Sequence, residues 1–445
     1  MNRFAILTLS TLLGISGATA AVTNDASGRV VAAQEADTAG YGRFRFGGYG
    51  EILGQFKDYG INRLNGTPTG NERLHRNTIS IPRFVLALDY KFSPKWVLGA
   101  EIEFEAGGVG TEYEIENSEN GEYETEMEKG GEVALEQFHI TYLGLPAVNV
   151  RVGHMILPLG QVNAHHEPIN FFGAQRPQSE TAFLPSTWHE TGIEIFGTFG
   201  RGKATFDYQA MVVAGLNANG FERDTWIAAG KQGFFETDNF TSPGYVGRVD
   251  WRGIKGLRTG VSFYYCRDAA ANSDKPHTYS DFRVPVAIGS WDAQYSCRWL
   301  TARANLVYGY VGNAKALSAA NKLLSNKSPY SRLTPIAKNS LSYGAELGVK
   351  VKSLVQVKFP DIVPFARYDY YNPQQRGCPG QTMDARFQVS QWQAGINWFA
   401  LPNLVVKADY TTRQIGTSKV FGKGPYNSEN EWEIGVAYIG WFIRK

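Results

Sequence analysis

Apolar and polar residues alternate with a period of two along most of the chain. In segment 96–106, Ile102 and Phe104 fall on one face, while Glu101 and Glu103 fall on the other. Successive side chains of an extended chain point to opposite faces, so this pattern predicts β-strands with one apolar and one charged face. The same alternation is present in segments 203–213, 391–399, 403–414 and 431–443.

The alternation and the turn residues between segments predict sixteen strands. They are 44–56, 77–91, 96–106, 133–143, 147–155, 189–198, 203–214, 243–252, 256–267, 282–297, 301–312, 339–351, 361–372, 386–400, 403–414 and 430–443. Strand ends are uncertain by about two to four residues, so counts of fourteen or eighteen also remain open.

The links between these strands alternate between short and long. The short links include 93–95, 144–146, 200–202, 253–255 and 401–402, and the long links include 57–76, 107–132, 156–188, 215–242, 313–338 and 415–429. Short turns at one end and long loops at the other are typical of outer-membrane barrels, whereas a soluble sandwich has no reason to sort its loops. The sequence therefore predicts an all-β fold: a closed antiparallel transmembrane β-barrel with short periplasmic turns and long extracellular loops.

A membrane-embedded barrel fixes which face of each strand points inward. A basic side chain facing lipid at mid-membrane costs about 2–4 kcal/mol, so the charged face must line the lumen. Sixteen strands enclose an aqueous lumen, whereas about eight would be filled by side chains. The inward basic residues predicted in this way are Arg83, Arg151, Arg248, Arg258, Arg303, Lys350, Arg367 and Lys407. The inward acids on the same walls are Glu101, Glu103, Asp207, Asp250, Glu346, Asp369, Asp409 and Glu433.

The first twenty residues have the pattern of a secretory signal peptide. Arg3 precedes an apolar stretch, and Ala18-Thr19-Ala20 is a small-x-small cleavage pattern. We expect a signal peptide over 1–20, a flexible lead over 21–43 and the barrel over 44–445.

Composition excludes several other classes of protein. Charged residues are 19% of the chain and aromatic residues 13%, and the net charge of +2 gives no reason to expect nucleic-acid binding. Glycine-rich phosphate loops, Gly-x-Ser-x-Gly and His-Glu-x-x-His motifs are absent from the sequence, so we expect no enzyme and no cofactor. His139 and His154 lie on predicted strands and are the candidates for a serine–histidine site. His139 falls on the predicted polar face, where a wall residue is a simpler interpretation than a general base.

Three stretches of the sequence resemble the phosphate-selective porin O and P family of Gram-negative outer membranes. They are Ile81-Pro82-Arg83-Phe84, the segment VRVGHMILPLG from Val150 to Gly160, and Pro364-Phe365-Ala366-Arg367-Tyr368-Asp369. The resemblance spans most of residues 44–443. It implies a sixteen-stranded channel, usually a homotrimer in outer-membrane lipid and lipopolysaccharide, that passes small hydrophilic solutes or ions by diffusion.

The charge pattern departs from that family. Its anion-selective members carry a ladder of lumen arginines, whereas here basic and acidic residues share the same strands. We therefore expect weak or mixed charge selectivity. For Arg151, Arg303 and Arg367, two roles remain open: binding anionic solutes, or pairing with neighbouring carboxylates such as Asp369.

The resemblance also implies that the third long loop, 156–188, folds into the barrel and narrows the pore. We call this segment the constriction loop, and its candidate pore-facing residues are His165, His166, Glu167 and Arg176. Adjacent histidines with a carboxylate can bind zinc, but neighbours in an extended chain point apart, so we expect no metal here.

The long link 107–132 is strongly acidic. Glutamates alternate with other residues on both sides of the segment 117–121, which predicts a β-hairpin with an acidic face. A cation-attracting vestibule, divalent bridging to lipopolysaccharide and an ordinary solvated loop all remain open for it.

Two alternatives to a channel remain. The barrel can act as an adhesin or scaffold through its long loops, and closure of the lumen by 156–188 and 215–242 would favour this. A barrel hydrolase is the third hypothesis, which labelling by a serine-reactive probe would support.

Overall fold

The computed structural model describes most of the barrel and its loops. The described residues are 42–58, 75–106, 112–117, 123–128, 132–232, 237–273, 276–325, 328, 330–355, 361–416 and 428–445. The predicted signal peptide and almost all of the predicted lead lie outside these residues.

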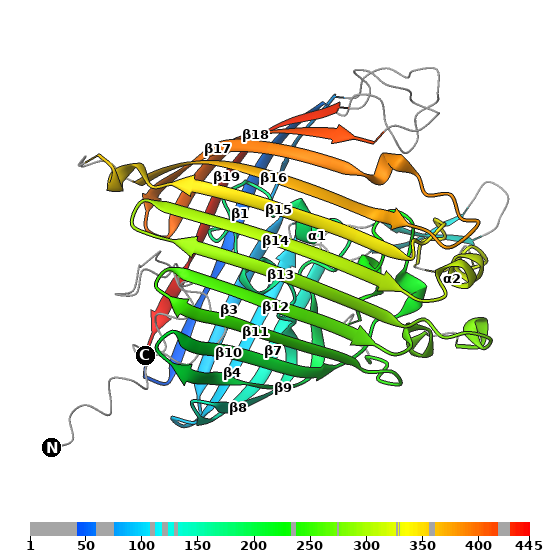
Figure 1. Cartoon of the computed structure of the whole chain (residues 1–445), viewed down its shortest axis with the longest axis horizontal. Coiled ribbons are helices and arrows are strands. Elements are labelled where there is room, and N and C mark those ends of the chain that lie inside the picture. Colours follow the sequence, from blue (N-terminus) through cyan, green and yellow to red (C-terminus); the bar gives the residue numbers. More distant parts are fainter. Residues whose placement is uncertain are drawn as a thin grey trace.

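Sixteen antiparallel strands form one closed barrel, as the alternation predicted (Figure 1). The strands are β1 (Phe44–Asp58), β2 (His75–Ser80) with β3 (Arg83–Lys91), β4 (Trp96–Glu105), β7 (Glu132–Leu145), β8 (Val148–Ile156), β9 (His189–Arg201), β10 (Ala204–Val213), β11 (Gly244–Ile254), β12 (Leu257–Cys266), β13 (Val286–Ser296), β14 (Leu300–Val311), β15 (Asn339–Val349), β16 (Asp361–Arg376), β17 (Val389–Leu401), β18 (Leu404–Ile415) and β19 (Ser428–Arg444). Pairing of β19 with β1 closes the barrel, from Arg45 opposite Arg444 to Asp58 opposite Asn430. Closure leaves the sheet without unpaired edges, which the interior of a membrane requires.

One predicted strand, 77–91, is divided into β2 and β3. Both pieces pair with β1, and the break falls at Ile81 and Pro82. Proline has no N–H for the ladder, which explains the interruption. The Pro82 carbonyl still accepts a hydrogen bond from the Ala106 N–H.

Two predicted strands begin too early along the chain. β13 starts at Val286 instead of 282, and β17 starts at Val389 instead of 386. Before β13, Pro285 offers only its carbonyl, which accepts a bond from the Gly312 N–H. Before β17, residues Ala385–Phe387 form a short 3₁₀ helix whose N-cap is Asp384.

The connections are sorted as predicted. The tight turns gather at the end of the barrel where β1 begins and β19 ends (Figure 1). The loops that carry helices lie at the opposite end or inside the barrel, except the link between β15 and β16, which carries Val351–Ser353 at the turn end. The helices are α1 (Gln178–Thr181) and α2 (Ala314–Asn321), with 3₁₀ segments Asn163–His165, Ala218–Gly220, Ala228–Gly230, Ala269–Asn272, Pro276–Tyr279, Val351–Ser353 and Ala385–Phe387. Among the described residues, no helix is long and apolar enough to cross a membrane.

The predicted acidic hairpin is present as a separate two-stranded sheet. β5 (Glu112–Asn117) pairs with β6 (Tyr123–Glu128), in a register that places Glu112 opposite Glu128 and Glu114 opposite Glu126. The role of the hairpin stays open.

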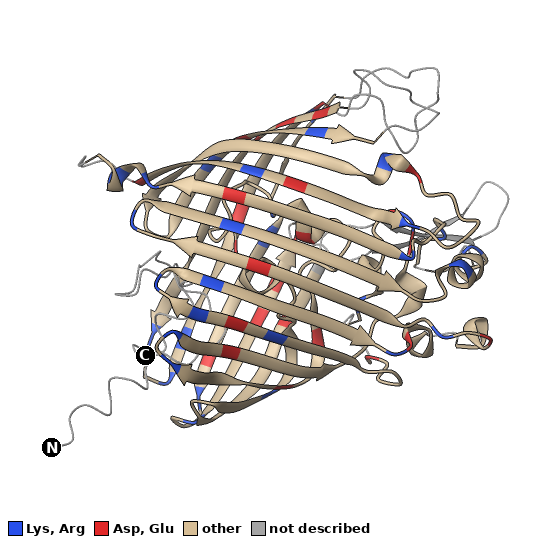
Figure 2. Cartoon of the chain, viewed as in Figure 1, with Lys and Arg blue, Asp and Glu red and all other residues tan. Residues whose placement is uncertain are grey.

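Side-chain exposure follows the predicted faces. Large apolar residues such as Val261, Phe263 and Trp392 are more than half exposed on the outer surface of the isolated chain, while Glu101 and Glu103 are buried inside. Acidic and basic positions are interleaved across the strands of the wall (Figure 2). The outer surface of the barrel is therefore apolar and the inner wall carries mixed charge.

The interior also contains an apolar core that the sequence analysis did not predict. It joins the constriction loop to the loops after β10, β12 and β14, and to inward residues near the ends of the strands. Its members include Met155, Leu157, Phe183, Trp188, Val213, Leu216, Phe221, Trp226, Val246, Val284, Leu317 and Ile336. The outer part of one side of the lumen is thus filled by packed loops.

Candidate functional site: the lumen and its constriction loop

The predicted lumen charges lie on the inner wall. Arg83, Glu101, Glu103, Arg151, Arg248, Arg303, Arg367, Asp369 and Lys407 are on barrel strands and are buried or nearly so. Lys350 is half-buried and lies one residue beyond the end of β15, so the predicted strand 339–351 was too long at that end. These positions agree with the predicted faces, and a role in solute passage remains a prediction.

The arginines of β14 and β16 share one carboxylate. Glu346 of β15 lies opposite Arg303 and Arg367 in the two ladders. Its oxygens are 2.5 Å from Arg303 Nη1 and 2.7 Å from Arg367 Nη2. Of the two roles left open for these arginines, the structure contains the ion pair with a carboxylate. The partner is Glu346 and not the expected Asp369.

A second ion-pair cluster lies on β11 and β13. Arg248 donates to Asp250 and Asp292 at 2.7–2.9 Å, and its Nη1 also donates to the Gly160 carbonyl of the constriction loop at 2.8 Å. On the same side of the wall, Arg151 of β8 pairs with Glu194 of β9 at 2.8 Å. The guanidinium planes are therefore fixed by bonds within the wall.

Lys407 holds the constriction loop and does not project freely into the lumen. Its Nζ donates to the carbonyls of Pro168, Phe171 and Gly173, the last two at 2.8 Å. It also lies 4.2 Å from the centre of the Phe171 ring, a cation–π distance. A single ammonium group with three donors thus fixes one turn of the loop.

The constriction loop, whose bounds in the structure are residues 157–188, crosses the lumen and contacts the wall on several sides. Gly160 N donates to the hydroxyls of Ser262 and Ser290 at 3.2 Å. Farther along, Ala174 N donates to Asp409 at 2.7 Å, and Ser179 donates to Asn305 at 3.1 Å. The loop is therefore tied to β12, β13, β14 and β18, and α1 appears within the barrel in Figure 1.

The four residues predicted on this loop have different surroundings. His165 Nε2 lies 3.1 Å from Arg258 Nη1, whereas His166 Nε2 lies 3.0 Å from the Glu136 carboxylate, so the adjacent histidines do point apart. Glu167 accepts a bond from Asn170 at 2.7 Å, and Arg176 donates to Ser186 at 2.5 Å within the loop. The structure brings only His166 of these four against strand β7.

A polar cavity of about 210 Å³ lies between the constriction loop and one side of the wall. Its lining residues are Lys57, Asp58, Gln175, Gln178, Tyr371, Arg413, Glu429 and Asn430. They come from β1, β16, β18, β19 and the loop. Arg413 falls on the predicted inward face of segment 403–414, so the alternation was sufficient to find it. Gln175 belongs to an irregular loop, where no periodicity marks it.

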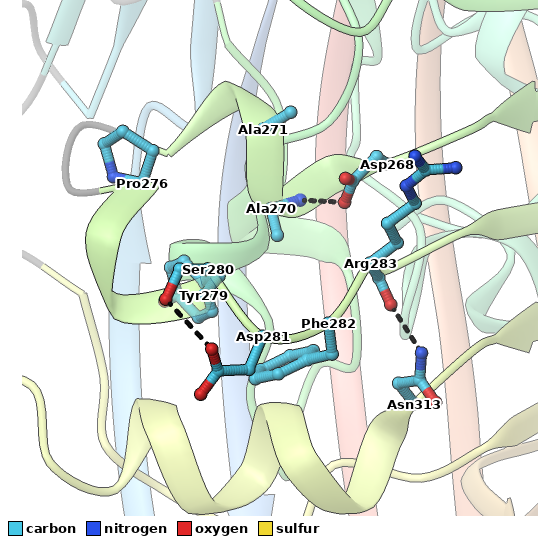
Figure 3. Close-up of a pocket in the computed structure, with 10 residues that line it drawn as sticks. All are labelled: Asp268, Ala270, Ala271, Pro276, Tyr279, Ser280, Asp281, Phe282, Arg283 and Asn313. Atoms are coloured by element: carbon cyan, nitrogen blue, oxygen red, sulfur yellow. Dashed lines mark hydrogen bonds between the residues drawn. The ribbon is translucent and has the colours of Figure 1, made fainter.

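A larger cavity of about 560 Å³ lies among the outer loops. It is lined by Asp268, Tyr279, Phe282, Arg283, Asn313 and neighbouring residues, beside α2 (Figure 3). Asp268 accepts from the Ala270 N–H, and Asn313 donates to the Arg283 carbonyl. These bonds order the loops around it.

Comparison of the sequence with known proteins finds one curated relative and no family. No family model matches the chain. A curated protein of Aquifex aeolicus (strain VF5), described as an uncharacterized protein, is 24% identical over 375 residues, covering 84% of this chain and 76% of that protein.

The fold itself is similar to that of several solved outer-membrane channels. Salmonella typhi OmpF, in a complex with daunomycin, has a TM-score of 0.54 at 10% identity, covering 89% of this chain and 97% of that chain. The anion-selective porin from Comamonas acidovorans has a TM-score of 0.52 at 9% identity, covering 89% and 99%. The channel DcaP of Acinetobacter baumannii has a TM-score of 0.50 at 10% identity, covering 89% and 96%. The chain is therefore a closed sixteen-stranded barrel of the outer-membrane porin type.

Proposed function

We propose that the chain is a porin of a Gram-negative outer membrane, through which small hydrophilic solutes and ions diffuse passively. The observation that carries this proposal is the polar cavity of about 210 Å³ between the constriction loop and β1, β16, β18 and β19. A sixteen-stranded barrel encloses an aqueous lumen, and we take this cavity to be the narrow polar passage that the loop leaves in it.

The passage is proposed to have weak or mixed charge selectivity. Its lining carries the basic residues Lys57 and Arg413 and the acidic residues Asp58 and Glu429. Fixed charges of opposite sign at similar depth oppose each other's attraction for a permeant ion. The paired arginines elsewhere in the wall support the same conclusion.

Kinship with the phosphate-selective porin O and P family is proposed on the three motifs given above. Within them, Arg83, Arg151 and Arg367 are engaged by wall carboxylates, so the proposal does not extend to phosphate selectivity. Assembly as a homotrimer in lipopolysaccharide-containing membrane belongs to the same proposal. The mass of the detergent-solubilised protein, measured before and after heat denaturation, tests the trimer.

The function is tested by ion conductance of the purified protein in planar lipid bilayers. We expect discrete conductance steps and a small reversal potential under a salt gradient. Heat-dependent gel migration of the same preparation verifies that the barrel is folded. Folded protein that never conducts would contradict a porin.

A second candidate is a non-channel barrel that binds partners through its loops. The observation that favours it is the apolar core joining the constriction loop to loop 214–243, in which Phe183 and Trp226 make an edge-to-face contact with ring centres 5.7 Å apart. The conductance experiment separates the two candidates, because a closed lumen gives no conductance steps.

We propose no catalytic role for the chain. Covalent labelling of the folded protein by a serine-reactive probe would contradict this.

A further inference from the structure

Three buried ligand-type side chains meet where the constriction loop touches the wall. Glu101 of β4, Glu136 of β7 and His166 of the loop each place one oxygen or nitrogen within 4.8 Å of the other two. Their exposed fractions are 3%, 0% and 2%. Two come from the barrel and one from the loop, so anything bound between them would join the loop to the wall.

One ring nitrogen of His166 faces Glu136 and the Tyr49 hydroxyl. Its Nδ1 lies 3.0 Å from the Asn163 carbonyl oxygen, which can only accept, so Nδ1 carries a proton. Nε2 lies 3.0 Å from Glu136 Oε1 and 2.9 Å from the Tyr49 hydroxyl, so a proton on Nε2 or on that hydroxyl satisfies it when no metal is bound. Loss of that proton frees the Nε2 lone pair for a cation held between His166 and Glu136. Metal-bound histidines commonly donate their other N–H to a backbone carbonyl in this way.

Glu101 supplies an independent observation. One of its oxygens accepts a bond from Gln137 Nε2 at 2.6 Å. The other oxygen, Oε1, is shielded from solvent and has no hydrogen-bond partner among the described residues. A buried carboxylate oxygen without a donor costs free energy, and a bound cation would remove that cost.

The local charge balance also favours a cation. Arg83 is paired with Glu103 and with Glu136, at 2.9 Å for the latter. Glu101 has a ligand oxygen within 4.8 Å of those of Glu136 and His166, so three carboxylates lie close to one guanidinium and one imidazole. A carboxylate has about four lone-pair sites on its two oxygens, so Glu136 can keep Arg83 and still bind a metal.

We propose that Glu101, Glu136 and His166 form a site for a divalent transition metal of the zinc type. One imidazole nitrogen and two carboxylates suit Zn²⁺, whereas Ca²⁺ and Mg²⁺ prefer ligands that are all oxygen. Ligand atoms around tetrahedral zinc, with bonds of about 2.0–2.1 Å, lie about 3.3 Å apart. The His166–Glu136 spacing of 3.0 Å is close to this value, and the Glu101 oxygen lies within 4.8 Å of both ligand atoms. Water fills the fourth position.

The consequence is a metal clamp that fastens the constriction loop to β4 and β7. This departs from the sequence-based expectation that the loop binds no metal. That expectation considered only the neighbours His165, His166 and Glu167, and the structure supplies different partners for His166. The site does not depend on the proposed porin function, since a closed scaffold barrel could be clamped in the same way.

The test is Zn²⁺ binding to the purified, metal-stripped full chain in detergent, measured by competition with a chromogenic chelator. We expect one Zn²⁺ per chain, and a loss of affinity of about tenfold or more in His166→Gln and in Glu101→Gln. His165→Gln is the matched control, because it changes the other histidine of the pair and leaves the three proposed ligands in place. Its affinity for Zn²⁺ should stay within about threefold of that of the unsubstituted chain, a change well below that caused by losing a ligand.

A second measurement keeps the test independent of how well the variants fold. Co²⁺ added to the unsubstituted chain should give visible absorption bands of a low-symmetry nitrogen and oxygen site, which Zn²⁺ then abolishes. The proposal is overturned if the unsubstituted chain binds no stoichiometric Zn²⁺. It is also overturned if His165→Gln loses as much affinity as His166→Gln, or if equimolar Mg²⁺ displaces the Zn²⁺. Conductance plays no part in these readouts, so failure of the porin proposal leaves them interpretable.

Discussion

At the scale of single residues, the inner wall is built from charges that satisfy one another or hold the constriction loop. Lys407 is the clearest case, because its ammonium group bonds three carbonyls of that loop. Alternation in the sequence placed Lys407 inside the barrel. It could not reveal the three carbonyls, since they belong to an irregular segment more than 230 positions away.

Lys407→Met should loosen the constriction loop. The substitution keeps much of the aliphatic stem and removes three charge-assisted bonds, each worth about 1.5–3 kcal/mol. We expect faster protease cleavage within 157–188 and noisier conductance, with the barrel still folded. Lys255→Met, at an exposed turn between β11 and β12, is the control. Equal protease resistance of the two variants would contradict the anchoring role.

Glu180 of α1 makes loop docking depend on pH. Burial and the nearby charge of Asp292 raise the pKa of Glu180 to about 7, above its usual value near 4.5. A carboxyl with a raised pKa binds its proton more tightly when docked, so docking is strongest below pH 4.5 and weakens as pH rises through 7. We therefore expect protease cleavage of the loop to increase between pH 5 and pH 8. In Glu180→Gln this increase should be smaller, and an unchanged pH profile in that variant would contradict the assignment.

At the scale of elements, each strand separates an apolar outer face from a polar inner face. Val261 is at the middle of β12 and 57% exposed on the outer surface, whereas Ile254 ends β11 and is 48% exposed at the turn end of the barrel. The position of a residue along its strand should therefore decide how much a charged side chain on the outer face destabilises the folded barrel.

Val261→Arg should destabilise the folded barrel by about 2–4 kcal/mol, while Ile254→Arg should cost about 0–1 kcal/mol. The physical reason is that the guanidinium of the first variant faces the centre of the hydrocarbon layer, and that of the second reaches the interface. Denaturant unfolding in lipid vesicles, followed by tryptophan fluorescence, measures both. Equal costs would mean that β12 does not cross the membrane as described.

The sequence was sufficient to predict this element-level arrangement because the period of two is a local property of each strand. The strand count, the sorting of turns and loops, and the inward side of Glu101 and Arg367 all follow from it. The break at Pro82 and the late start of β13 do not follow from the period of two, because each depends on a proline that has no N–H to donate. The path of the constriction loop and the partners of His166 depend on contacts between distant segments, which periodicity does not encode.

At the scale of the whole molecule, the lumen combines a charged wall with an apolar core of loops on one side. The core places Trp226 against Phe183 of the constriction loop and fills the lumen on its side. The polar cavity next to β1 and β19 lies between the loop and the wall. The preference of the barrel for cations or anions should therefore depend on the few charges that line that cavity.

Arg413→Gln and Glu429→Gln should shift the reversal potential in opposite directions. Removing the Arg413 charge raises the preference for cations, and removing the Glu429 charge raises the preference for anions. A unit charge about 4 Å from a permeant ion contributes about 1 kcal/mol in water, a roughly fivefold change in local occupancy. The potential is measured in planar bilayers under a salt gradient, and raising the ionic strength should shrink both shifts because salt screens the charges.

Asp281→Asn is the matched control for this pair. Asp281 is exposed and lines the separate cavity of the outer loops, so its charge should leave the reversal potential almost unchanged (Figure 3). A large shift in the control would place the selective charges in the outer loops. Shifts of the same sign for Arg413→Gln and Glu429→Gln would exclude the polar cavity as the conducting path, because opposite charges on one path must act oppositely on a permeant ion.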